Sequence, residues 1–75
     1  MGEYRHLSGK QIIKVLESMG FQQARQRGSH VVMKKDLPVG SIGCVVPIHK
    51  EVAIGTLRAL LKQAKITLKE FQQNL

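Results

Sequence analysis

His30 is the residue of this sequence whose type and surroundings best suit acid–base chemistry. It follows the basic run Arg25-Gln26-Arg27-Gly28-Ser29, in which a guanidinium can bind a phosphate while an imidazole exchanges a proton near neutral pH. RNA carries its own nucleophile, the 2′-hydroxyl, so one base beside a bound phosphate is enough to start strand cleavage. The segment therefore predicts action on RNA, by cleavage with His30 as general base or acid or by binding alone.

The other residues that often carry chemistry are weaker candidates. His6 lies in the N-terminal segment and is expected to be inert, and His49 is expected to serve structure or a partner contact rather than a phosphate. Cys44 is the only cysteine, which excludes an internal disulfide, and its alternation with Val46 and Ile48 is typical of a small core residue. The histidines lack metal-ligand spacing, so neither a metal nor a small-molecule cofactor is expected.

The length and composition of the chain indicate a small basic domain. A chain of 75 residues allows one hydrophobic core, and 43% apolar residues are too many for a disordered chain. The net charge of +7 indicates a polyanionic partner. Only three aromatic residues, Tyr4, Phe21 and Phe71, are present, too few for a base-stacking sheet, so contacts are expected to phosphates and shape. The lone cysteine, and the lack of a signal-like segment or a membrane-spanning apolar run, predict a cytoplasmic protein without membrane contact.

Periodicity and capping signals predict an α+β fold in a single domain over residues 1–75. The N-terminal residues 1–7 are expected to be loose. The expected elements are a helix over 9–19, strands over 21–27, 29–35 and 42–48, an amphipathic basic helix after residue 51, and a short helix over 68–74. Ser8 with Gln11 forms a capping box and Gly20 stops the first helix. Two helices are expected to cover one face of a three-stranded antiparallel sheet and to leave the other face open.

The turn between the first two strands determines which residue faces His30. With Arg27-Gly28 as the two central residues, Arg25 pairs with His30. The open face then carries Arg25, His30 and Lys34, and the inward positions are Ala24, Val31 and Met33. Arg25 is expected to bind a phosphate beside the imidazole, whereas Lys34, about 13 Å along the strand, contacts another phosphate.

Four segments in this order resemble the HicA-type toxins of the YcfA-like group. They are Gly20-Phe21, Arg25-Gln26-Arg27-Gly28-Ser29-His30, Val46-Pro47-Ile48-His49 and Gly55-Thr56-Leu57-Arg58-Ala59-Leu60-Leu61-Lys62-Gln63-Ala64. The resemblance covers residues 8–71 and implies a double-stranded-RNA-binding-like fold with mRNA interferase activity. It implies that His30, the histidine of the Gly-Ser-His segment, is catalytic, and that a HicB-type antitoxin is the partner. Ala53-Ile54 depart from the family pattern, in which many members have Lys-Pro before Gly-Thr-Leu.

Three hypotheses about function follow. The first is a toxin of a type II toxin-antitoxin system, a metal-independent endoribonuclease that cleaves mRNA with His30 as catalytic residue. Its expected RNA contacts are Arg25, Arg27, Gly28, Ser29, Lys34 and Lys62. The alternative is a non-catalytic RNA-binding module of the same fold, in which His30 is only a contact. The third is an interaction protein whose basic surface serves an acidic partner.

Overall fold

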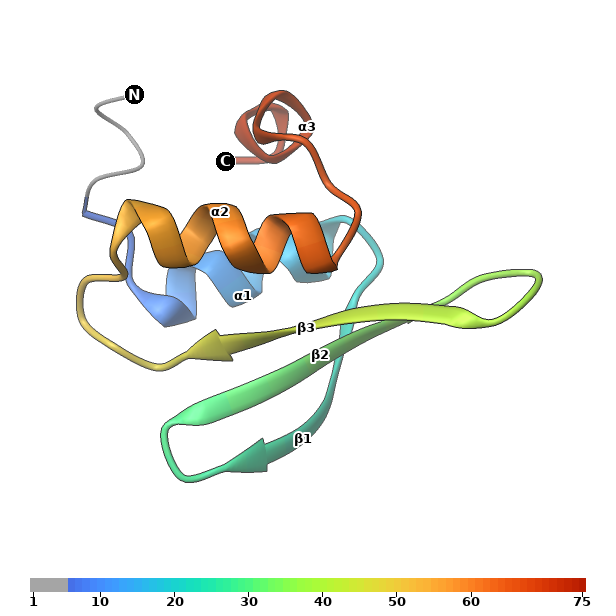
Figure 1. The fold of residues 1–75 in the computed structure, drawn as a ribbon, viewed down its shortest axis with the longest axis horizontal. Helices are drawn as coiled ribbons and strands as arrows, with labels where there is room; N and C mark the ends of the chain where they lie inside the picture. Colours follow the sequence, from blue (N-terminus) through green and yellow to red (C-terminus); the bar gives the residue numbers. More distant parts are fainter. Residues whose placement is uncertain (1–5) are drawn as a thin grey trace.

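The computed structural model describes residues 6–75, and its elements follow the predicted order (Figure 1). They are α1 (Gly9–Ser18), β1 (Gln22–Arg27), β2 (His30–Asp36), β3 (Ser41–Pro47), α2 (Ile54–Gln63) and α3 (Leu68–Gln73). The strands form one sheet in the order β1-β2-β3, and both pairings are antiparallel. The predicted α+β class and open three-stranded sheet are confirmed, and the architecture is compatible with a double-stranded-RNA-binding-like fold.

The ends of α1 are determined by local hydrogen bonds. The Gln11 backbone N–H donates to the Ser8 hydroxyl at 3.1 Å, and the Ser8 N–H donates to the Gln11 side-chain oxygen at 2.8 Å. Gly20 has a φ of 97°, a conformation that glycine adopts without steric cost. The N–H of Phe21 then donates to the Leu16 carbonyl, which closes the last turn. The predicted capping box and helix stop are both present.

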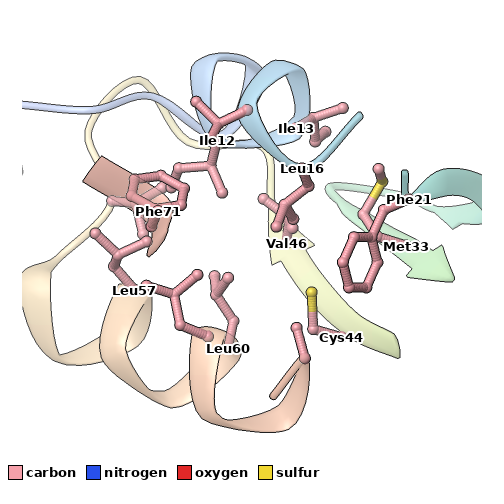
Figure 2. Packing of buried hydrophobic residues seen from close by; sticks show 14 of the residues in the cluster. Ile12, Ile13, Leu16, Phe21, Met33, Cys44, Val46, Leu57, Leu60 and Phe71 are labelled. Carbon is pink, nitrogen blue, oxygen red and sulfur yellow. The ribbon is translucent and has the colours of Figure 1, made fainter. Parts of the chain in front are cut away.

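A single apolar cluster joins the helices to β2 and β3 (Figure 2). The inward positions of the two strands are buried as predicted: Val31, Met33, Cys44 and Val46. Phe71 of α3 is also fully buried, so the short terminal helix contributes to the same core. Within residues 6–75, no polar or charged residue is buried. Burial raises the pKa of the Cys44 thiol to about 11, which agrees with the predicted role of a core residue.

The strand β1 lies at the edge of the sheet and extends beyond the helices (Figure 1). All six of its residues are exposed. Ala24 was predicted to face the helices, and this prediction is wrong, because Ala24 lies at an irregularity of the pairing between Gln23 and Arg25. A bulge on a polar edge strand discourages pairing with strands of other chains. Because all six residues are exposed, both faces of β1 are open to a ligand.

Part of the N-terminal segment that was expected to be loose belongs to the folded domain. Residues 1–5 lie outside the described part of the chain. Leu7, however, is buried, and its carbonyl accepts a hydrogen bond from the Val52 N–H at 2.8 Å. His6 Nδ1 lies 2.9 Å from Glu51 Oε1. The expectation of a loose segment is thus wrong for Leu7, whose apolar side chain packs in the core.

Gly9 brings the start of α1 into close contact with the end of β3. A Cβ at this position would collide with the Pro47 carbonyl oxygen, so only glycine permits the approach. The Gly9 N–H also donates to the His49 carbonyl at 2.9 Å. Pro47 is the β3 residue that pairs with His30. The contact therefore supports the end of the sheet at which His30 lies.

Candidate nucleic-acid interface

The first hairpin turn has Gly28 and Ser29 as its two central residues, so the predicted Arg27-Gly28 turn is wrong by one residue. Gly28 has a φ of 54° and Ser29 does not have a positive φ. Glycine at the first central position is typical of a type II′ turn. The side-chain amide of Gln26 donates to the Gly28 carbonyl at 3.1 Å and stabilises the turn. Gly-Ser is itself a two-residue hairpin signal, so the sequence held the information for the correct turn.

Arg27 is the residue that pairs with His30 across β1 and β2. The predicted pair of Arg25 and His30 is therefore wrong, and Arg25 pairs with Val32. Directly paired residues on one face have Cβ atoms about 5 Å apart. Arg25, Arg27 and His30 are all exposed. A cation thus stands opposite the imidazole as expected, but it belongs to Arg27.

His30 lies between two neighbouring strands. On the side away from Arg27 it pairs with Pro47 of β3. The carbonyl of the preceding residue, Ser29, accepts a hydrogen bond from the Ile48 N–H at 2.6 Å, which continues the pairing beyond the strand. The backbone of His30 is thereby fixed, while its exposed side chain remains accessible to a ligand.

His30 also lines an open pocket of about 230 Å³ between the outward face of β3 and α2. The lining of this His30 pocket is completed by Val45, Pro47, Thr56, Ala59, Leu60 and Gln63. Thr56, Ala59 and Gln63 are spaced three and four residues apart, so they project from one face of α2. Helix α2 therefore packs on the core through one stripe and borders the outward face of the sheet with the next.

Lys34 of β2 and Lys62 of α2 are the two lysines among the predicted RNA contacts. Lys34 is exposed on β2 four residues after His30, which corresponds to about 13 Å along a strand. Lys62 is exposed on α2 three residues after Ala59, so it neighbours the helical wall of the His30 pocket. The structure brings Arg27 next to His30, places Arg25 and Lys34 further along the sheet, and places Lys62 on α2.

Comparison with known families identifies the family of this chain. The family model described as HicA toxin of bacterial toxin-antitoxin matches residues 9–66. The chain belongs to the HicA toxin family. This match includes the whole sheet and α2, and so every residue of the interface described above. A search of curated proteins gives no match. Membership makes this chain a HicA toxin, whose counterpart is an antitoxin.

Sequence reasoning named Lys62 of α2 but missed the α2 residues that line the His30 pocket of this HicA toxin. Thr56, Ala59 and Gln63 occupy the helix surface between the buried leucines and the basic stripe of Arg58 and Lys62. Their spacing on one helix face was readable. Their position beside His30 was not, because it depends on how α2 packs against β3.

Lys35 is a basic residue of the HicA toxin with a structural role. Its Nζ donates to the Met19 carbonyl at 3.0 Å, at the C-terminal end of α1, where a cation is favourable. The same atom lies 5.9 Å from the centre of the Phe21 ring. Lys35 is therefore engaged within the fold, unlike its exposed neighbour Lys34.

Two further properties of residues 6–75 concern metals and membranes. No three His, Cys, Asp or Glu side chains in this range are grouped so that they could hold a metal ion. None of the helices in this range has the length and apolar character needed to cross a bilayer.

Proposed function

We propose that this HicA toxin is an endoribonuclease that cleaves mRNA with His30 as its catalytic residue. The observation that carries the proposal is the direct pairing of His30 with Arg27 on an exposed face. A guanidinium binds two oxygens of one phosphate, which places that phosphate beside the imidazole. The Gly-Ser-His sequence of this segment resembles the catalytic segment of the family. Together they supply a base, a cation and an open surface for RNA.

The cleavage step uses the 2′-hydroxyl of the RNA. His30 accepts the proton of that hydroxyl, the 2′-oxygen forms a bond to phosphorus, and the bond from phosphorus to the 5′-oxygen breaks. Water at the exposed face gives a proton to the leaving 5′-oxygen and later takes one from the imidazolium. Arg27 stabilises the negative charge on the phosphate oxygens. The products are a 2′,3′-cyclic phosphate and a 5′-hydroxyl, and the step requires neither a metal nor a small-molecule cofactor.

The remaining contacts hold the RNA strand along this surface. Arg25, Lys34 and Lys62 bind phosphates other than the one that reacts, because Arg27 is the cation that pairs directly with His30. The space beside Gly28 is open, because no atom lies within 4 Å of the position that a Cβ would take. Since glycine has no side chain to occupy this space, the RNA backbone can approach the turn closely. The Ser29 hydroxyl is a positioning group at the same turn.

A HicB-type antitoxin is the proposed partner that neutralises the toxin. The toxin carries a net charge of +7, so an acidic partner that covers the basic face would exclude RNA from His30. The pair is proposed to act in the cytoplasm, where mRNA is present. All 75 residues are proposed to form one HicA-like domain.

Incubation of the purified protein with RNA in excess chelator tests the proposal. The wild type should cut the RNA, and His30→Ala should lower the rate by about 10²–10⁴-fold, the usual contribution of general base catalysis. His6→Ala is a matched control, because the His6 side chain is 78% exposed and lies outside the interface. Intact RNA with the wild type, or equal cleavage by His30→Ala, would refute the proposal. Binding without cleavage would favour the non-catalytic RNA-binding module.

A further inference from the structure

We infer that the His30 pocket binds one nucleobase of a single-stranded RNA, the base next to the phosphate bound by Arg27. The inference rests on the proposed function, since it names the part of the RNA that the same site recognises. The pocket begins at His30 and continues to α2. A nucleotide whose phosphate lies at Arg27 therefore has its base within reach of the pocket.

The lining of the pocket suits a flat, uncharged ring. Val45, Pro47 and Ala59 provide aliphatic walls, and apolar side chains are among the groups between which proteins hold unstacked bases. Gln63 offers both a donor and an acceptor, which can pair with the edge of an exposed base. At about 230 Å³ the pocket is smaller than the roughly 300–1,000 Å³ of sites for larger organic ligands. It has space for one base.

The distribution of charge favours a nucleotide over an acidic protein segment. Among residues 6–75, no lysine or arginine lines the pocket, so a carboxylate inside it would find no permanent cation from this part of the chain. Cations stand outside it instead, with Arg27 opposite His30 and Lys62 beside Ala59. This arrangement matches a nucleotide, whose base is neutral and whose phosphates lie outside the base.

The exposure of Val45 shows that this wall of the pocket is uncovered. Val45 is 41% exposed on the outward face of β3, where no element of residues 6–75 buries it. Apolar walls with a few polar groups at a concave site are typical of binding pockets. Thr56, Ala59 and Gln63 are exposed beside it. The pocket is therefore accessible in the free toxin.

Cleavage of RNAs that lack a single base tests the inference. An RNA with one cut site is compared with versions that carry an abasic nucleotide on either side of the cut. For the wild type, removal of one of these two bases should slow cleavage about tenfold, at the low end of what a stacked base contributes. Ala59→Leu fills the pocket, so this variant should cut the intact RNA about tenfold more slowly and no longer respond to the missing base.

Ala53→Leu is the matched control for Ala59→Leu. It makes the same change at an exposed position that precedes α2 and lies outside the pocket, so it should keep the wild-type rate and the wild-type response to the missing base. Circular dichroism of each variant shows whether the helix content of the wild type is retained. A response to the missing base that persists in Ala59→Leu would overturn the inference and leave the proposed function intact.

Binding measured without cleavage separates the inference from the proposed function. Fluorescence anisotropy compares short single-stranded oligonucleotides with 2′-deoxy sugars, one with all its bases and one abasic throughout. The wild type should bind the first about tenfold more tightly, and Ala59→Leu should remove this difference. That result would support the pocket even if the wild type cut no RNA. Equal binding of both oligonucleotides by the wild type, or a difference that persists in Ala59→Leu, would overturn the inference.

Discussion

Arg27, the last residue of β1, pairs directly with His30, the first residue of β2 after the Gly28-Ser29 turn. The turn therefore determines which cation stands beside the imidazole. With Arg27-Gly28 in the centre of the turn, Arg25 would face His30, whereas the observed turn places Arg25 opposite Val32. The phosphate-binding role in the proposed cleavage consequently belongs to Arg27.

Loss of Arg27 should impair cleavage more than loss of Arg25. Arg27→Ala removes the cation next to the reacting phosphate and should lower the cleavage rate by about 10²–10³-fold, as loss of one charge-stabilising donor does. Arg25→Ala should weaken RNA binding with a smaller effect on the rate, because Arg25 faces Val32. Arg27→Lys should recover only part of the rate, since an ammonium cannot bind a phosphate bidentately. Single-turnover kinetics measure each effect, and a larger rate loss in Arg25→Ala would contradict the assignment.

Gly9→Ala should destabilise the domain. The added Cβ would collide with the Pro47 carbonyl oxygen, and overpacking of this kind costs about 1–3 kcal/mol in the free energy of unfolding. Gly55→Ala in α2 is the matched control, because a Cβ there meets no atom within 4 Å and alanine favours a helix by up to about 1 kcal/mol. Urea unfolding should show opposite signs for the two variants. Equal effects would show that α1 can move away from β3.

Glu70 should make the stability of the domain depend on pH in the acid range. The Thr67 N–H donates to the Glu70 carboxylate at 2.9 Å, and this bond, with the Thr67 hydroxyl as a further partner, lowers the pKa of Glu70 from its ordinary 4.5. A lowered folded-state pKa stabilises the domain above 4.5, and this contribution is lost as the pH falls through the folded pKa. Glu70→Gln should therefore reduce the loss of stability between pH 5 and pH 2 in urea unfolding. Glu17→Gln is the control. This role would be contradicted if Glu70→Gln lost as much stability between pH 5 and pH 2 as the wild type and Glu17→Gln do.

Cys44 should be unreactive in the folded toxin. Burial raises the pKa of its thiol to about 11, so at pH 8 the thiol is protonated and covered. A thiol reagent should modify the native protein slowly and the urea-unfolded protein rapidly. Fast modification in native buffer would show that the strands around Cys44 open readily.

Features of the fold that depend on neighbouring residues were predictable. The Ser8 and Gln11 capping box and the positive φ at Gly20 follow from the residue types at a helix end. The inward positions Val31 and Met33 follow from alternation along a strand that has one buried face. These signals act over a few residues, so the sequence alone shows them.

Features that depend on a single φ angle or on tertiary packing were not predicted. The register of the hairpin depends on whether Gly28 takes the first or the second central position of the turn, and the two choices differ by one residue. The wall that Ala59 contributes beside His30 depends on the packing of α2 against β3. The close approach at Gly9 depends on a contact with residues almost 40 positions away in the chain. His30 could be chosen from its sequence neighbours, but the wall that α2 places beside it could not.

Mass spectrometry of the RNA ends formed in excess chelator tests the central claim most directly. If His30 activates the 2′-hydroxyl, the wild type produces fragments with 2′,3′-cyclic phosphates and 5′-hydroxyls, and His30→Ala produces almost none. Fragments with 3′-hydroxyl ends, or cyclic ends formed equally by wild type and His30→Ala, would contradict the claim that His30 catalyses cleavage.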